Sequence, residues 1–206
     1  MAGFIYILKG LLIGVIVSLP IGPIMMLTVQ KSVNDGRKAG FSCGLGATVV
    51  DTTCALVSAF ALGAIGSFVE RHTSWIEIIG GLIIAGVGVG MLLTRVGKER
   101  RVRSYSPRNF VRAATMGFSN PAALAVMLAM FAGFKMNFSP DQWPLGLASV
   151  LAVGVGSASF WYIFSRVIAH IGDRFKFSVL VWISRLAGAG VILFGLYLTF
   201  KGIFSL

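Results

Sequence analysis

The chain is 206 residues long, with 56% apolar residues, only 12% charged residues and a formal net charge of +11. An ordinary soluble domain is about 25% charged, so this composition excludes a soluble globular domain with a normal polar surface. The composition instead predicts an all-α integral membrane protein, and the length fits a single transmembrane domain over residues 1–206.

Six apolar segments are long enough to cross a bilayer as helices, which takes about 20 residues each. In chain order, the predicted spans are Phe4–Val29, Phe41–Val69, Trp75–Thr94, Val111–Phe134, Leu145–Ile168 and Val179–Phe200. The second span is long enough to tilt or break. The first span has no basic leader and no A-x-A cleavage site after it, so we expect it to be retained and not cleaved as a signal peptide.

The 18 basic residues divide unevenly between the two sides that six spans would define. Fourteen fall on one side, in the turn after the first span, in the segment 95–112, and in the region from the fifth span into the sixth. The other side holds only Lys9, Arg71, Lys135 and Lys201. Loops rich in Lys and Arg stay in the cytoplasm, so we expect segment 95–112 to be a cytoplasmic loop and both termini to lie outside.

Two short sequences interrupt the apolar spans, and the first is Pro20-Ile21-Gly22-Pro23. A proline inside a helix removes a backbone hydrogen bond and clashes with the preceding turn, so two prolines around a glycine should break the first span. Freed backbone groups at membrane depth must be buried in protein or line a wet cavity, and broken helices commonly build transporter sites. A simple packing kink is the alternative, because Pro and Gly are frequent in membrane helices.

The second interruption is Ser119-Asn120-Pro121 in the fourth span, where Asn120 brings an amide into the apolar layer. Taken alone, it fits a hydrogen bond between helices equally well. Its position is more informative, because the fourth span begins the second half of the chain as the first span begins the first half. Three spans per half reverse the direction of the second half. The paired breaks therefore predict two inverted three-helix repeats, about 1–95 and about 111–206, with a site between them.

Asp51 is the only acidic residue near the centre of a predicted span. A carboxyl group at the bilayer centre costs about 2.5–3.5 kcal/mol on insertion scales, so such a residue usually faces a cavity and has a function. In that setting it could pair with a cationic group or exchange a proton. The alternative is a structural role, in which a neutral Asp51 bonds the hydroxyl groups of the neighbouring Thr48, Thr52 and Thr53.

Other chemistries find little support in the sequence. No paired carboxylates, no H-E-x-x-H motif and no His or Lys at depth that could activate a Ser or Thr are visible, so we expect no catalytic residue and no enzyme activity. Cys43 and Cys54 lie on one predicted helix, and no Cys/His cluster indicates a metal or a cofactor. No nucleic-acid-binding module is visible. The basic loop either binds anionic lipid headgroups or only sets the topology.

Several motifs follow one another in order along nearly the whole chain. They are Pro20-Ile21-Gly22-Pro23, Gly36-Arg37-Lys38-Ala39-Gly40, Gly44-Leu45-Gly46 followed by Asp51, Gly117-Phe118-Ser119-Asn120-Pro121, and Trp161. In this order they resemble the LysE/RhtB family of bacterial amino-acid exporters, which has a P-G-P motif, a G-R-x-x-G turn, an acid in the second span, an Asn-Pro motif in the fourth and a Trp in the fifth. Two departures are the inserted Ile21 and Ala122, which stands where Lys is frequent.

The resemblance implies a secondary transporter of a bacterial-type inner membrane that exports amino acids or related small amino-bearing metabolites, driven by the proton motive force. The residues that we assign to substrate binding and coupling are Asp51, Pro20, Gly22, Pro23, Asn120 and Pro121. A metal-ion or other small-solute transporter of the same superfamily is one alternative. A structural membrane subunit that transports nothing is the other.

The expected partners are the small-molecule substrate and the lipid bilayer. Two small-residue motifs, Gly40-x-x-x-Gly44 and Gly86-x-x-x-Gly90, bring backbones close enough for helices to pack tightly. This packing could occur within one chain or between the chains of a homo-oligomer, and the sequence leaves both arrangements open.

Overall fold

The structure is a computed structural model that describes residues 2–19, 22–64, 71–93, 108–136, 138, 140–172 and 177–204. Within these residues, all regular secondary structure is helical, which confirms the predicted all-α class. The helices are α1 (Ala2–Ser18), α2 (Pro23–Asp35), α3 (Arg37–Ala64), α5 (Thr73–Leu93), α6 (Arg108–Phe118), α7 (Pro121–Gly133), the short 3-10 helix η1 (Pro140–Gln142), α8 (Trp143–Ile171) and α9 (Phe177–Phe204).

The helices follow the predicted spans, including the two predicted breaks. The second, third, fifth and sixth spans correspond to α3, α5, α8 and α9, and α3 is unbroken over its described length. The first and fourth spans are each divided into two helices, α1 with α2 and α6 with α7. The end of the second predicted span after residue 64, Thr94, and most of the basic loop 95–112 lie outside the described residues.

Two helices are long and apolar enough to cross a membrane by themselves, namely α8 and the Arg37–Leu62 part of α3. The bent pair of α6 and α7 is a third candidate if it counts as one span. Shorter apolar stretches lie at Gly3–Ser18, Ser74–Gly90 and Gly188–Phe204. The described residues therefore support a membrane protein, whereas the count of six spans stays a prediction.

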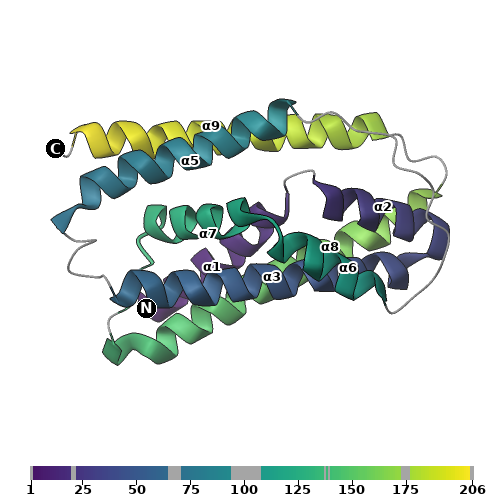
Figure 1. The fold of residues 1–206 in the computed structure, drawn as a ribbon, viewed down its shortest axis with the longest axis horizontal. Helices are drawn as coiled ribbons and strands as arrows, with labels where there is room; N and C mark the ends of the chain where they lie inside the picture. The colour runs from purple at the N-terminus through teal and green to yellow at the C-terminus, as the bar shows by residue number, and fades with distance from the viewer. Residues whose placement is uncertain are drawn as a thin grey trace.

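α8 is the helix around which the bundle is built, because it packs against both α1 and α3 (Figure 1). Gly10 allows α1 to approach closely, since a Cβ atom there would lie only 2.5 Å from the carbonyl oxygen of Ser149 on α8. Ile13 of α1 and Val153 of α8 are both fully buried beside this contact. Packing against α8 thus holds the end of α1 at the centre of the bundle.

α5 and α9 form a second layer, which runs along one side of the bundle (Figure 1). Their backbones approach at glycines. A Cβ atom on Gly88 would lie 2.7 Å from the carbonyl oxygen of Gly188, and one on Gly195 would lie 2.6 Å from the carbonyl oxygen of Gly81. α5 also packs against α7, which connects this layer to the rest of the bundle.

The two predicted small-residue motifs behave differently. Gly40 lies against α2 and Gly44 lies against α8, so this motif packs helices within the chain. A Cβ atom on Gly86 or Gly90 would meet nothing within 4 Å among the described residues. The second motif therefore does not bring helices of the described chain together, and its role in a homo-oligomer stays a prediction.

Large apolar side chains cover much of the outer surface. They lie on several helices and include Leu186 on α9, which is 75% exposed, and Phe204 at its end, which is 87% exposed. Soluble monomers rarely expose large continuous apolar patches, because water solvates such patches poorly. A lipid bilayer would cover these side chains, which agrees with the membrane class predicted from composition.

Candidate functional site

The chain leaves the helical conformation between α1 and α2, in the middle of the first predicted span. Gly22 is extended, with φ −135° and ψ −175°, and it is the N-cap of α2. Pro23 lies in the first turn of α2, where a helix tolerates the missing N–H. The predicted break is confirmed, although Pro20 itself lies outside the described residues. Because Gly22 has no side chain, it cannot cap the first N–H groups of α2 with a hydrogen bond.

A second break separates α6 from α7, whose directions differ by 70°. In the last turn of α6, the Thr115 carbonyl oxygen accepts two hydrogen bonds from Ser119. The Ser119 N–H donates over 3.0 Å, and the Ser119 hydroxyl donates over 2.8 Å. Asn120 follows, and its N–H donates to the Gly117 carbonyl oxygen over 3.1 Å. Pro121 then begins α7 at a position that suits proline. The predicted break in the fourth span is also confirmed.

Asp51 is on α3 and contacts serine hydroxyl groups from two other helices. Ser157 of α8 donates to Asp51 Oδ2 over 2.7 Å, and the hydroxyl of Ser18, the last residue of α1, lies 3.4 Å from the same oxygen. These two hydroxyl groups are 3.1 Å apart. The Thr48 hydroxyl, one turn earlier on α3, lies 3.2 Å from the Ser157 hydroxyl. The carboxyl group therefore lies where α1, α3 and α8 meet.

The partners of Asp51 differ from those that a purely local role would use. The hydroxyl groups of Thr52 and Thr53 donate to the carbonyl oxygens of Thr48 and Val49, each over 2.7 Å, within their own helix. Asp51 is instead bonded across the bundle, by residues that are distant in the sequence. The carboxyl group thus joins both halves of the chain.

The hydroxyl groups around Asp51 have fewer protons to donate than they have hydrogen-bond contacts. Each hydroxyl has one proton to donate, and Ser18 can also donate to the Gly14 carbonyl oxygen over 2.9 Å. When Ser157 donates to Asp51, its own oxygen can accept a bond from Ser18 or Thr48. Among the described residues, both serines approach Oδ2, so Oδ1 is the carboxyl oxygen open to a cationic group or a proton.

A cavity of about 310 Å³ extends from Asp51 to both helix breaks. Its wall includes Ser18, Gly22, Asp51, Asn120 and Trp161. Small-ligand pockets in proteins have volumes of about 300–1,000 Å³, so this cavity would hold a small solute. Asn120 is exposed, so the cavity reaches the molecular surface.

The sequence model of LysE type translocators matches residues 15–202. The chain belongs to the LysE type translocator family. The members of this family are membrane transporters and not enzymes. Both helix breaks and Asp51 lie inside the matched region. No curated protein and no solved structure matches the chain.

The translocator brings three of the predicted site residues into one cavity. Gly22, Asp51 and Asn120 all belong to its wall, although they come from three different parts of the sequence. Pro23 and Pro121 begin the two helices whose first turns line the same cavity. The prediction of a shared location is therefore supported by the geometry, while the roles of these residues in binding and coupling stay predictions.

Sequence reasoning missed the two serines that bond Asp51. Ser18 and Ser157 are small hydroxyl residues of a kind that is common inside the predicted spans, so neither is distinctive in the sequence. Ser157 is fully buried, and Ser18 is 3% exposed. Their only distinguishing property is that they converge on one carboxyl group, which becomes visible only when α1 and α8 pack together.

Trp161 is a third residue of the translocator site to which the sequence assigned no role. It is 3% exposed and packs against the rings of Phe160 and Phe164. Its indole N–H has no hydrogen-bond acceptor within the part of the chain that the structure describes. A buried donor without an acceptor costs about 1–3 kcal/mol, so the indole N–H is an unmet hydrogen-bond donor on a residue of the cavity wall.

Proposed function

We propose that this translocator exports amino acids or related small amino-bearing metabolites from the cytoplasm, and that protons drive the export. The observation that carries the proposal is the carboxyl group of Asp51, which lies on a cavity between two broken helices. A carboxylate pairs with the ammonium group that these solutes share. An acid at membrane depth can also take up a proton, so Asp51 can hold either a solute or a proton and thereby couple their movements.

The helix breaks offer complementary groups for the carboxylate of an amino acid. The first turns of α2 and α7 line the cavity through Met25 and Ala123. Helix N-termini favour anions, because their N–H groups and the helix dipole present partial positive charge. Trp161 also belongs to the cavity wall, and its buried indole N–H has no acceptor among the described residues. A cavity with one acidic group and several donors suits a solute that carries both charges.

The contacts between helices support a transport cycle in which the two halves move against each other. α1 packs against α8, the middle helix of the other half, and both α6 and α7 pack against α3, the middle helix of the first half, whereas α2 packs mainly against α3 of its own half. The middle helices α3 and α8 pack together, and so do the last helices α5 and α9. The contacts of α1, α6, α7 and the α3–α8 and α5–α9 pairs are those expected of inverted repeats, which move around a fixed central site to expose it to each side in turn.

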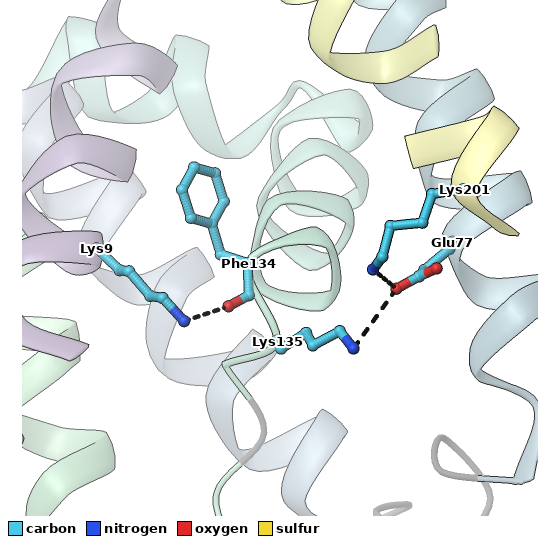
Figure 2. Close-up of polar contacts among 5 residues, drawn as sticks. All are labelled: Lys9, Glu77, Phe134, Lys135 and Lys201. Carbon is cyan, nitrogen blue, oxygen red and sulfur yellow. Dashed lines mark hydrogen bonds and ion pairs between the residues drawn. The ribbon is translucent and has the colours of Figure 1, made fainter. Parts of the chain in front are cut away.

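We further propose that the translocator spans a bacterial-type inner membrane six times, with both termini outside. The distribution of basic residues supports this orientation, because cytoplasmic loops are enriched in Lys and Arg. Three of the four basic residues predicted for the outer side, Lys9, Lys135 and Lys201, lie near one another in the structure (Figure 2). The cytoplasmic side would then load the cavity, and the outer side would release the solute.

An export assay in cells tests the proposed function. Cells that overproduce the translocator are given an excess of one amino acid or dipeptide at a time, and its internal concentration is followed. We expect the wild-type chain to lower the internal concentration of at least one such solute. Asp51→Asn keeps the size of the side chain and removes its charge, so it should slow export by ~10-fold or more, which corresponds to about 1.4 kcal/mol.

The membrane level of each variant, measured by immunoblot, is the control for this assay. Export at the wild-type rate by Asp51→Asn, at an equal membrane level, would remove the role of Asp51. If the wild-type chain moves no amino acid or dipeptide, the proposed substrate class is wrong.

A further inference from the structure

Charged residues join the two halves of the chain near the end of α7 (Figure 2). Glu77 of α5 is 4% exposed and accepts a hydrogen bond from Lys201 of α9 over 2.6 Å. The ammonium group of Lys135, which follows α7, lies 3.9 Å from the same carboxylate oxygen. Lys9 of α1 donates to the carbonyl oxygen of Phe134 over 2.8 Å. Each contact connects a residue of the first half with a residue of the second half.

We propose that these contacts form the outer gate of the translocator. In the structure they hold the outer end of α7 between α1 on one side and the α5–α9 layer on the other. Release of a solute to the outside would require the contacts of α7 to separate. The inference rests on the proposed function, because a gate has meaning only in a transporter that opens to two sides.

The gate residues lie well outside the cavity along the helices that they share with it. Lys9 precedes the cavity residue Val17 by eight residues on α1, and Glu77 precedes the cavity residue Val87 by ten residues on α5. A rise of 1.5 Å per residue puts both gate residues roughly 12 to 15 Å from the cavity along the helix axes. They therefore form a separate layer, and not part of the binding site.

Packed apolar side chains occupy the layer between the gate and the cavity. Ile13 of α1, Ile84 of α5 and Phe131 of α7 belong to one core cluster, and each is at most 1% exposed. Such close packing leaves no route for a polar solute. The cavity is thus closed toward the gate end, by an apolar layer beneath and by the gate contacts above it.

The backbone at the end of α7 shows why Lys135 is unusual. Its φ of 53° lies in the left-handed region that favours glycine. The Met136 N–H donates to the Phe131 carbonyl oxygen over 2.8 Å, and the Lys135 N–H donates to that of Ala132 over 2.9 Å. These bonds define a Schellman motif, in which glycine is the usual residue at this position. A lysine here fits the backbone less well but reaches Glu77, which a glycine could not do.

The contacts of the gate differ in strength in a way that suits opening. The bond between Lys201 and Glu77 lies inside the α5–α9 layer, where close helix packing keeps the two residues together. Lys135 is 61% exposed and contacts Glu77 only at 3.9 Å, and exposed ion pairs of this kind are weak. We therefore expect the contacts of α7, through Lys135 and Phe134, to separate first.

Cysteine labelling tests the gate without measuring transport. Val87→Cys puts a reporter of similar size on the cavity wall, in a chain whose Cys43 and Cys54 are replaced by Ala. A membrane-impermeant maleimide is added to right-side-out vesicles, and the rate of labelling is measured. Lys135→Gly removes the gate side chain and supplies the residue that the backbone favours, so this variant should fold at least as well as its parent. We expect labelling from outside to accelerate at least ~3-fold, and further when Lys9→Met is added.

Arg71→Met is the matched control, because Arg71 is an exposed basic residue predicted for the same side but makes no gate contact. It should leave the labelling rate unchanged. The gate is refuted if the labelling rate from outside is the same in the parent, in Lys135→Gly and in Lys135→Gly combined with Lys9→Met. This comparison requires that the reporter is still labelled from the cytoplasmic side. An equal acceleration by Arg71→Met would overturn it as well. Faster labelling in a chain that exports no amino acid would instead preserve the gate and refute the proposed substrate.

Discussion

Replacement of Gly88 by Ala tests the packing of α5 against α9, which joins the last helices of the two halves. The added Cβ atom would lie 2.7 Å from the carbonyl oxygen of Gly188 and 2.7 Å from Cγ1 of Ile192, whereas ordinary contacts begin at 3.4 Å. The helices would have to separate, and overpacking of this kind costs about 1–3 kcal/mol. Gly86→Ala adds the same methyl group two residues earlier, where it meets nothing within 4 Å.

The comparison of these two variants isolates the packing cost. Both gain the same helix propensity, roughly 0.8–1 kcal/mol for Ala over Gly, so that contribution cancels in the difference. Thermal unfolding of the purified variants in detergent, followed by tryptophan fluorescence, measures the effect. At about 2–4 °C per kcal/mol for a chain of this size, Gly88→Ala should unfold several degrees below Gly86→Ala. Equal unfolding temperatures would refute the close approach of α5 and α9.

Two further predictions concern the site. Ser157→Ala removes the shortest hydrogen bond to Asp51. Hydrogen bonds to charged groups contribute about 1.5–3 kcal/mol, so the export rate at limiting substrate should fall ~10-fold or more. Ser149→Ala on the same helix is the control, because that hydroxyl donates to a carbonyl of its own helix; an equal loss there would contradict a specific role. Pro23→Ala and Pro121→Ala should each slow export at saturating solute by restoring helix at the breaks, and wild-type rates in both would contradict a site built on broken helices.

The helix breaks could be predicted from sequence because the effect of proline is local. Pro23 and Pro121 each occupy the start of a helix that follows an interruption. Asp51 could also be identified, because a single acid in an apolar span needs no knowledge of the fold to stand out. The paired breaks also predicted a shared site between the halves, and Gly22, Asp51 and Asn120 do line one cavity.

The polar partners were not predictable, and the reason is the distance between them in the sequence. Ser18 and Ser157 are 33 and 106 residues from Asp51. Lys9 donates to a backbone carbonyl 125 residues away, and a carbonyl has no sequence signature at all. Glu77 falls near the start of the third predicted span, and nothing in the sequence indicates its partner. Charge sorting predicted only that its lysine partners share one side of the membrane.

Coupled proton and amino-acid movement in liposomes that contain the purified translocator tests the central claim most directly. An outward gradient of the exported amino acid is imposed, and a trapped pH indicator reports the movement of protons. The wild-type chain should move protons inward as the amino acid leaves, while Asp51→Asn should move both at least ~10-fold more slowly, although it folds and inserts normally. Proton movement coupled to amino-acid efflux at the wild-type rate in Asp51→Asn would contradict the account.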